Sequence, residues 1–337
     1  MPEQLRSLGE FGWLHRLRRR AGPWGPRDGL GLGEDTAALP PIRGDWLLAT
    51  VDTLIEDIHF RRRWASFADI GHKALAVSLS DIAAMGGTPR WALVALGVPD
   101  TTLIEDLDAF YGALGDLAQQ HGVEVVGGDT TRSEFLLAST TVLGEGIRAQ
   151  TLTRAGARPS DRVCVTGDLG LAAAGLVLLE TEAPVDDAVA AAVQRLLRPQ
   201  PRLAAGRALA ATGRVTACID LSDGLSSDIC RIAEESGVGA RIDLAAVPCA
   251  AACRAAAARC GGDALQWALE GGEDYELLFT VAPEGEPEVA AALRAAGAAC
   301  IAVGEIVPAG AGVTAHADGV TRTLGHGFDH FRGRDGE

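Results

Sequence analysis

Short apolar segments alternate with helical stripes along the first half of the chain. Residues 46–51 form an apolar run that predicts a buried strand. Leu75, Leu79 and Ile82 repeat at the spacing of one helix face. This stripe predicts a helix over residues 70–85 that stops at a Gly-Gly pair. Similar patterns predict a strand at 91–98, a helix at 103–121, an apolar stretch at 122–126 and a strand at 136–144.

The second half of the chain repeats this alternation after a break. Polar and turn residues gather over 148–160, which predicts a boundary between two domains. The expected strands are 162–166, 215–220, 239–243, 275–281 and 300–306, and the expected helices include 223–236, 250–260 and 288–296. Such alternation is typical of helices packed on a sheet. We therefore expect a two-domain α/β protein, with an α+β domain over 1–150 and an α/β domain over 151–337.

Composition limits the classes of function. The chain has 337 residues, 47% of them hydrophobic and 22% charged, which suits one large or two medium globular domains. A net charge of −15 disfavours a general nucleic-acid binder, because phosphate backbones are held by basic surfaces. No stretch approaches the roughly 18 apolar residues of a membrane span, so we expect a cytoplasmic protein that does not enter a membrane.

The cysteines and the single lysine further limit the kinds of site that the chain can contain. The seven cysteines are odd in number and lack a Cys-X-X-Cys pair, so we expect reduced thiols rather than disulfides or zinc ligands. Lys73 is the only lysine among 30 basic residues, which the base composition of a genome can explain. A P-loop of the form G-x-x-x-x-G-K-[S/T] is absent, so ATP would have to be held in another way.

The informative chemistry is a set of aspartates placed where strands or helices are expected to end, each beside Gly, Ser or Thr. They are Asp35, Asp52, Asp81, Asp129, Asp220 and Asp223. Mg²⁺ prefers octahedral oxygen coordination, and proteins hold it with one or two carboxylates plus phosphate oxygens of the substrate. Neighbouring glycines let backbone amides approach those phosphates. The set therefore predicts a phosphate site with several Mg²⁺ ions.

Each of these positions also has a simpler explanation, because Asp and Gly are the commonest turn residues. Asp223 could begin the following helix, with Ser222 as its N-cap. Asp81 is harder to dismiss, since a carboxylate inside an apolar helical segment needs a partner. Asp52 is expected to follow a strand, at the sheet edge where ligands usually bind. His59 is either a substrate contact or an ordinary half-buried histidine.

Two further segments have a structural and a functional interpretation. Glu273 and Asp274 stand between a Gly-Gly pair and a predicted strand, where the simple expectation is a turn with an exposed acidic pair. Phe328 and Phe331 lie near the end of the chain, where an aromatic cluster usually docks on the core.

Together the motifs resemble the thiamine-monophosphate kinase family from about residue 9 to 331. In family order they are GEFGWLHRL, GED, TVDTLIEDIHF, SLSDIAAMGGTPRWAL, VVGGDTTRS, LTRAGARPSD, IDLSDGLSSD, GGEDYELLFT and GFDHF. That family belongs to the superfamily of aminoimidazole ribonucleotide synthetase, selenophosphate synthetase and a hydrogenase maturation factor. The resemblance implies the superfamily's two-domain fold and a homodimer whose N-terminal sheets pair. The motifs that mark the two sibling enzymes, an N-terminal Cys and Lys pair and a terminal cysteine, are not found.

The resemblance also implies roles for matching residues. The Mg²⁺ ligands correspond to Asp35, Thr50, Val51, Asp52, Asp81, Asp129, Asp220 and Asp223, and Val51 could offer only its backbone carbonyl. The ATP contacts correspond to Tyr111, Gly128, Asp129, Arg154 and Ser222. The substrate contacts correspond to His59, one or both of Glu273 and Asp274, and Phe328, which stands where many relatives carry Trp. On this basis the first domain binds ATP and Mg²⁺ and forms the dimer.

The implied reaction is direct in-line transfer from ATP to thiamine monophosphate, giving ADP and thiamine diphosphate. The nucleophile is a phosphate oxygen that is already ionised, so no general base is required. Two unit charges about 4 Å apart repel by about 4 kcal/mol at an effective dielectric near 20, and bound metal ions and Arg154 would offset this repulsion. Two rivals remain: a sibling enzyme that uses ATP to activate an amide or formyl oxygen, and a module that binds thiamine phosphates or nucleotides without releasing ADP.

Overall fold

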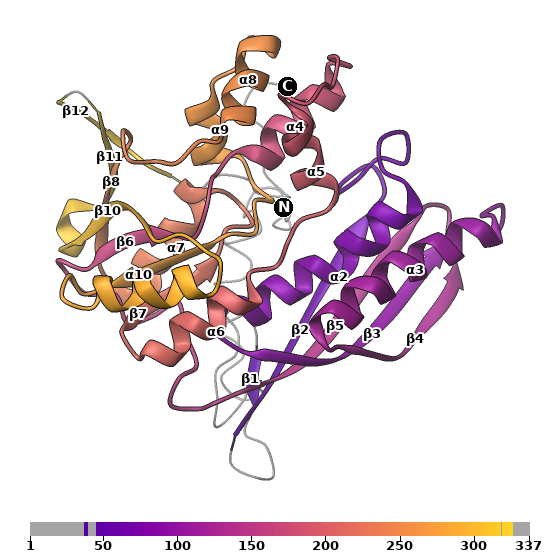
Figure 1. Cartoon of the computed structure of the whole chain (residues 1–337), viewed down its shortest axis with the longest axis horizontal. Coiled ribbons are helices and arrows are strands. Elements are labelled where there is room, and N and C mark those ends of the chain that lie inside the picture. The colour runs from indigo at the N-terminus through magenta and orange to yellow at the C-terminus, as the bar shows by residue number, and fades with distance from the viewer. Residues whose placement is uncertain (1–36, 40–44, 318, 326–337) are drawn as a thin grey trace, which may run out of the picture.

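The protein consists of two β-sheets, one in each half of the chain, with helices packed on them (Figure 1). The structure is a computed structural model that describes residues 37–39, 45–317 and 319–325. The first sheet has the strand order β1-β2-β5-β3-β4. Its strands are β1 (Ala37–Leu39), β2 (Trp46–Ile55), β3 (Thr88–Val98), β4 (Glu124–Arg132) and β5 (Leu137–Gly146). Neighbouring strands are antiparallel except β3 and β4, which are parallel.

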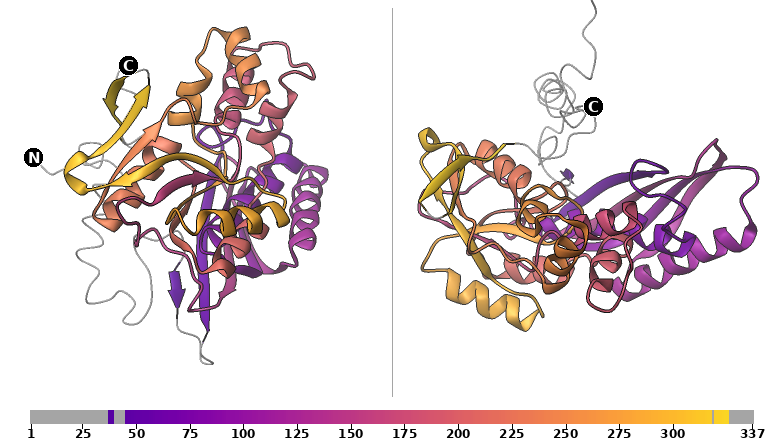
Figure 2. Two further views of the ribbon diagram at one scale, coloured as in Figure 1. Left: turned by 60° about the vertical axis from the view of Figure 1, so that its left-hand side comes forward. Right: turned by 90° about the horizontal axis from the view of Figure 1, so that it is seen from above.

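Helices cover one face of this first sheet. They are α2 (Phe67–Ala84) and α3 (Ile104–His121), and both lie on the same side of the strands (Figure 2). Alternate residues of the strands point to the other face, where Val51, Trp91 and Leu93 are exposed. In the described part of the chain this second face is not covered by a helix.

Helix α2 starts at a capping box. The Ser66 hydroxyl accepts a hydrogen bond from the Asp69 amide at 3.2 Å, and the Asp69 carboxylate accepts one from the Ser66 amide at 3.1 Å. Almost every residue from Ile70 onward is buried. A helix that is apolar on all sides must be covered on all sides, so α2 can only be an internal element.

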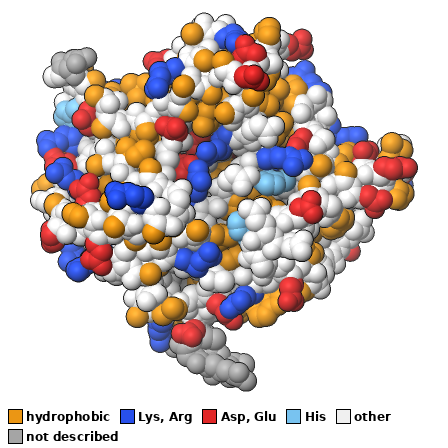
Figure 3. Space-filling view, viewed as in Figure 1, with side chains coloured by type: hydrophobic (Ala, Val, Ile, Leu, Met, Phe, Trp, Pro, Cys, Tyr) orange, Lys and Arg blue, Asp and Glu red, His pale blue; other side chains and the backbone are white. Residues whose placement is uncertain are grey.

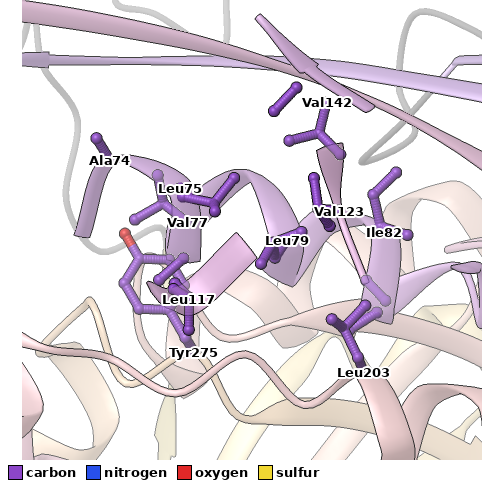
Figure 4. Close-up of a cluster of buried hydrophobic side chains, with 14 of the residues drawn as sticks. Ala74, Leu75, Val77, Leu79, Ile82, Leu117, Val123, Val142, Leu203 and Tyr275 are labelled. Carbon is purple, nitrogen blue, oxygen red and sulfur yellow. The ribbon is translucent and has the colours of Figure 1, made fainter. Parts of the chain in front are cut away.

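Figure 4 shows what covers helix α2. Val142 of β5 lies on one side, and Leu203 and Tyr275, from the second half of the chain, lie on the other. These side chains belong to one continuous apolar core that joins both halves. Helix α2 is therefore the element through which the first sheet contacts the rest of the protein.

The second sheet has seven strands in the order β12-β11-β8-β10-β6-β9-β7. They are β6 (Arg162–Val165), β7 (Val215–Asp220), β8 (Gly239–Asp243), β9 (Leu277–Val281), β10 (Ile301–Val307), β11 (Val313–Ala317) and β12 (Val320–Thr323). The helices of this half are α4 (Leu171–Glu180), α5 (Ala190–Leu197), α6 (Leu203–Thr212), α7 (Leu225–Ser236), α8 (Ala251–Cys260), α9 (Ala264–Glu270) and α10 (Glu286–Ala295), with a 3₁₀ turn η1 (Ala309–Ala311). Among these pairings only β8 and β11 run parallel.

The predicted fold class, an α+β first half and a second half with helices packed on a sheet, is confirmed. Two placements are wrong. β2 continues to Ile55, so Asp52 lies inside a strand rather than in the loop after it, and Asp129 lies inside β4. Helix α9 and the antiparallel pair β11 and β12 were not expected. No helix within the described ranges is long and apolar enough to cross a bilayer, and the seven cysteines have free thiols.

Candidate functional site

A cleft of about 520 Å³ lies between the two halves of the chain. It is lined by β2, helices α2 and α4, the end of α5, and the loops that contain Ile58 to Ala65, Ser222 and Asp223, and Gly271 to Glu273. Acidic and basic side chains both line it. Figure 3 shows the two kinds intermingled across one face of the molecule, so the net negative charge does not form a single patch on that face.

One turn of helix α2 gathers two residues of strand β2. The Thr50 hydroxyl donates a hydrogen bond to the Asp81 carboxylate. One turn earlier, the Ser78 hydroxyl is 2.8 Å from an oxygen of Asp52 and 3.0 Å from the Thr140 carbonyl. Thr50 and Asp52 are two residues apart along β2. Their side chains therefore lie on the same face of the strand, toward the helix. The carboxylate inside the apolar helix thus has the partner that its position requires.

The same turn of α2 reaches the second half of the chain. The Ser80 hydroxyl is 2.6 Å from an oxygen of Asp220, the last residue of β7. Asp220 is buried, as is Ser80. Hydroxyl and carboxylate oxygens from three elements, β2, α2 and β7, therefore converge around one helical turn.

The loop after β7 continues this acidic region. Asp223 forms a salt bridge with Arg231 of α7, and its amide is 3.2 Å from a carboxylate oxygen of Asp228. Burial raises the pKa of Asp228, although Arg231 opposes the shift. The positive charge of Arg154 lies close enough to Arg231 to act to lower the pKa of Arg231. Gly224, rather than Ser222, is the N-cap of α7, so neither alternative explanation of Ser222 and Asp223 holds.

A second loop packs against this one, backbone to backbone. The Glu273 amide donates to the Ser222 carbonyl at 2.8 Å, and the Tyr275 amide donates to the Leu221 carbonyl at 2.9 Å. At Gly272 a Cβ atom would lie 2.3 Å from the Ser222 oxygen, so only glycine fits there. Glu273 follows with φ of 68°, a left-handed conformation that non-glycine residues rarely adopt.

Lys73 of helix α2 holds Glu273 in that position. Its ammonium group is 2.7 and 2.8 Å from the two carboxylate oxygens of Glu273 and 3.2 Å from the His59 carbonyl. The His59 ring accepts a hydrogen bond on Nδ1 from the Ile55 amide at 3.1 Å. A neutral His59 ring therefore carries its proton on Nε2. Lys73, Glu273 and His59 all line the cleft.

Asp274 differs from its neighbour. It is buried and accepts hydrogen bonds from the Gly170 and Ala172 amides, at 2.6 and 3.2 Å, at the start of helix α4. Burial raises its pKa to about 7, and the two amides oppose this shift. The expectation of an exposed acidic pair is therefore wrong, because Glu273 is only half-buried at the cleft wall while Asp274 caps a helix away from it.

Comparison with known proteins identifies the family. Residues 33–145 match the AIR synthase related protein N-terminal domain, and residues 158–316 match the corresponding C-terminal domain. The thiamine-monophosphate kinase of Escherichia coli O157:H7 is 39% identical over 96% of this chain and 99% of its own length. That of Bacillus subtilis is 38% identical over 82% of this chain and 85% of its own.

A solved structure of "AaThiL complexed with AMPPCP and TMP" has a TM-score of 0.86 at 32% identity and covers 98% of this chain and 99% of that one. The chain belongs to the thiamine-monophosphate kinase family. The resemblance predicted from the motifs is confirmed, and with it the two-domain fold of the superfamily and the assignment as a kinase.

Three residues matched to the family's nucleotide and metal contacts lie apart from the cleft. Gly128 and Asp129 are on β4, three strands away from Asp52 in the sheet order. At about 4.8 Å per strand this separates the backbones by roughly 14 Å. Tyr111 is half-exposed on α3, edge-on to Phe110. At Gly128 a Cβ atom would lie 1.9 Å from the Val94 carbonyl, so strand packing alone requires this glycine.

Two of the predicted site residues, Asp35 and Phe328, lie outside the described residues. The loss of aromatic area expected from Phe328 in place of Trp therefore stays a prediction. Val51 is described, and its side chain is exposed on the open face of the first sheet. A role for Val51 in the kinase family's metal site would have to use its backbone oxygen, as expected.

Sequence reasoning missed several residues that shape this site. Ser78 and Ser80 orient Asp52 and Asp220, and the signal was their alternation with apolar residues in the string SLSD. Lys73 stood out in the sequence only as the sole lysine.

Tyr275 also lines the cleft. Burial raises its pKa, and the charges of four carboxylates raise it further, namely Glu273, Asp52, Asp220 and Asp223.

The donor atoms fit Mg²⁺ by type. In the described stretches, no three His, Cys, Asp or Glu side chains are arranged to hold a metal ion by themselves. Mg²⁺ at a phosphate site needs fewer, because it keeps waters and binds phosphate oxygens. The groups that meet around α2 are a threonine hydroxyl and three carboxylates, all oxygen donors, and nitrogen or sulfur ligands are not among them.

Proposed function

We propose that this chain transfers the terminal phosphoryl group of ATP to thiamine monophosphate, giving ADP and thiamine diphosphate. The observation that carries the proposal is the convergence of Asp52, Asp81 and Asp220, from both halves of the chain, on one turn of helix α2 beside a 520 Å³ cleft. The relative with AMPPCP and TMP, similar along nearly the whole chain, supports the choice of substrates.

The proposed metal site uses Mg²⁺, with several ions at the site. Thr50, Asp52, Asp81 and Asp220 would hold it, and Asp35, Asp129, Asp223 and the Val51 carbonyl extend the proposed set. Bound Mg²⁺ neutralises phosphate charge and polarises the transferred phosphoryl group. Ser78 and Ser80 fix the orientation of two of these carboxylates in advance, which lowers the cost of arranging them around a ligand.

The proposed reaction needs no general base, because the acceptor is an ionised phosphate oxygen. What the chain supplies is position and charge. Arg154, near Arg231 and Asp223, would face the ATP phosphates together with Ser222. His59 and Glu273 would contact the thiamine end, and Asp274 is assigned to the helix cap instead.

We further propose a homodimer in which the open faces of two first sheets pair. This face exposes Val51, Trp91 and Leu93, and apolar side chains on an uncovered sheet are stabilised by a partner. Asp129 pairs in register with Ala95, a residue of the same exposed face, so Asp129 would act near that interface. We place the domain boundary at 150/151, between the two sheets, and the enzyme in the cytoplasm.

Product analysis tests this function. The protein is mixed with ATP and Mg²⁺, with and without thiamine monophosphate, while ADP release and thiamine diphosphate are followed by chromatography. Both products should appear together, and only with thiamine monophosphate. ADP without thiamine diphosphate would favour a sibling reaction that activates an oxygen atom, and binding without ADP would favour a storage module.

The metal site is tested by Asp81→Asn. The amide keeps the size of the side chain and an acceptor for Thr50 but removes the charge. Turnover should be abolished, by about a thousandfold or more, since the loss of several kcal/mol of electrostatic stabilisation is expected. The unfolding curve should stay close to that of the wild type. Unchanged turnover would rule out Asp81 as a ligand.

A further inference from the structure

The chain's only lysine is buried at the boundary between the two halves. Lys73 is 4% exposed at its side chain and lies on α2, two turns before Asp81. A buried ammonium group is costly unless it is paired and hydrogen-bonded. Lys73 meets this requirement with groups that line the cleft, so its position is tied to the cleft rather than to the apolar core around it.

The contacts of Lys73 join two substrate-side residues that are distant in sequence. Glu273 comes from the loop before β9, and the His59 carbonyl comes from the loop after β2. All three donor hydrogens of an ammonium group can be used here, two on the carboxylate and one on the carbonyl. One side chain thus fixes both the carboxylate of Glu273 and the backbone next to the His59 ring.

Glu273 needs such a constraint. Its φ of 68° is unfavourable for a residue with a side chain, and conformations of this kind persist only when surrounding contacts enforce them. The amide of Glu273 is held by Ser222 and its carboxylate by Lys73. Without the ammonium group, the carboxylate is held at the cleft wall only through its backbone.

We propose that Lys73 is a positioning residue for the thiamine end of the substrate, acting through Glu273 and the His59 loop. The inference rests on the proposed function, since it concerns the same cleft. Loss of Lys73 is then expected to weaken binding of thiamine monophosphate, whereas binding of ATP, which the proposed function assigns to the metal ligands around Asp81, is preserved.

The alternative is that Lys73 only forms one of the ion pairs that join the two halves and does not position the substrate. The chain offers a matched control for this. Arg198, which follows α5, pairs with Asp69 of α2 at 2.6 Å, one turn before Lys73, and Arg198 does not line the cleft. Arg198→Met removes an ion pair between the halves without touching Glu273 or His59.

The experiment measures KM for each substrate and kcat in the wild type, Lys73→Met, Glu273→Gln, the double variant and Arg198→Met, at a temperature where all remain folded. Methionine retains the unbranched length of the lysine stem. Lys73→Met should raise KM for thiamine monophosphate by about tenfold or more, as expected for losing a charged hydrogen bond, and leave KM for ATP within about twofold. In the double variant the rise in KM for thiamine monophosphate should be smaller than the product of the two single effects, because both changes remove the same Lys73–Glu273 interaction and only the His59 contact is lost in addition.

Three results would overturn the inference. The first is an unchanged KM for thiamine monophosphate in Lys73→Met, and the second is a double variant in which the effects of Lys73→Met and Glu273→Gln on that KM multiply. The third is a rise in that KM in Arg198→Met as large as in Lys73→Met. Failure of the proposed function gives a different result, because the wild type itself would then form no thiamine diphosphate. A wild type that turns over, with variants that behave as described, supports both.

Discussion

Two glutamates three residues apart, Glu273 and Glu276, are paired with cations in opposite settings. The Glu276 side chain is fully buried, and it accepts hydrogen bonds from Thr166 at 2.7 Å, from Arg195 at 2.7 Å and from Arg202 at 2.8 Å. The Glu273 side chain is 28% exposed, faces the cleft and has Lys73 as its cation. Both belong to the segment between α9 and β9, so local sequence alone does not separate them.

The two glutamates differ in whether their carboxylate oxygens remain available to a ligand. Both oxygens of Glu276 are occupied by side chains that join the segment directly after β6, helix α5 and the start of α6, and solvent does not reach them. Burial raises the pKa of Glu276, but Arg202 and Arg195 outweigh it and lower the pKa below its ordinary value. Glu273 keeps an exposed portion at the cleft. Glu276 therefore stabilises the fold, whereas Glu273 serves the site.

The sharpest test exchanges each glutamate for glutamine. Glu276→Gln should cost about 3–5 kcal/mol in the free energy of unfolding, because the fully buried carboxylate is the shared counter-charge of two partly buried arginines. Glu273→Gln should cost less, about 1–3 kcal/mol, since its carboxylate is partly hydrated and Lys73 keeps the His59 carbonyl. Urea denaturation measures both changes.

A surface pair calibrates that measurement. Glu288 pairs with Arg214 at 2.8 Å, with both side chains more than half exposed, and Glu288→Gln should cost no more than about 1 kcal/mol. KM for thiamine monophosphate should rank Glu273 and Glu276 the other way, high in Glu273→Gln and unchanged in Glu276→Gln. If Glu276→Gln were as stable as Glu288→Gln, the proposed structural role would be wrong.

Asp274, between the two glutamates, provides a pH test. Its pKa in the folded chain is about 7, against an ordinary value of 3.8. Between pH 4 and 7 the folded chain therefore holds a proton that the unfolded chain has released, so this group makes folding less favourable as pH rises, by up to about 1.4 kcal/mol per pH unit. Above pH 7 the contribution levels off.

Asp274→Asn should remove this dependence, because an amide does not titrate in that range and still offers an acceptor to the Gly170 and Ala172 amides. The stability of the wild type relative to the variant should decline between pH 4 and 7 and then stay constant. Urea unfolding at four pH values measures the difference. Parallel curves for the two proteins would show that Asp274 is ionised throughout.

Sequence patterns predicted the helices and strands better than they predicted the contacts between side chains. The apolar stripe of α2 and the bounds of β7 and β8 were found because the periodicity is local. Asp52 was misplaced, since a carboxylate inside a strand is unexpected until Ser78, 26 residues later, is known to face it. The motif order identified the family, but order along a chain contains no distances.

The choice between Glu273 and Asp274 could not be made from sequence. Both are acidic and adjacent, and the left-handed backbone at Glu273 sends them to opposite sides. The partners of Asp274 are more than 100 residues away, on helix α4, and Lys73 is 200 residues from Glu273. Only the packing of the two halves decides which carboxylate faces the cleft.

The smallest expected effect concerns the start of the helix that carries Lys73. Ser66→Ala removes the acceptor for the Asp69 amide and should cost about 1 kcal/mol in the free energy of unfolding. Ser66→Thr, which retains a capping hydroxyl, should recover most of that stability. KM for thiamine monophosphate should be unchanged in both, because Lys73 lies nearly two turns inside the helix and is fixed by Glu273 and His59 rather than by the cap. A rise in KM in Ser66→Ala, reversed in Ser66→Thr, would instead mean that the whole helix, and not the Lys73 contacts alone, positions the site.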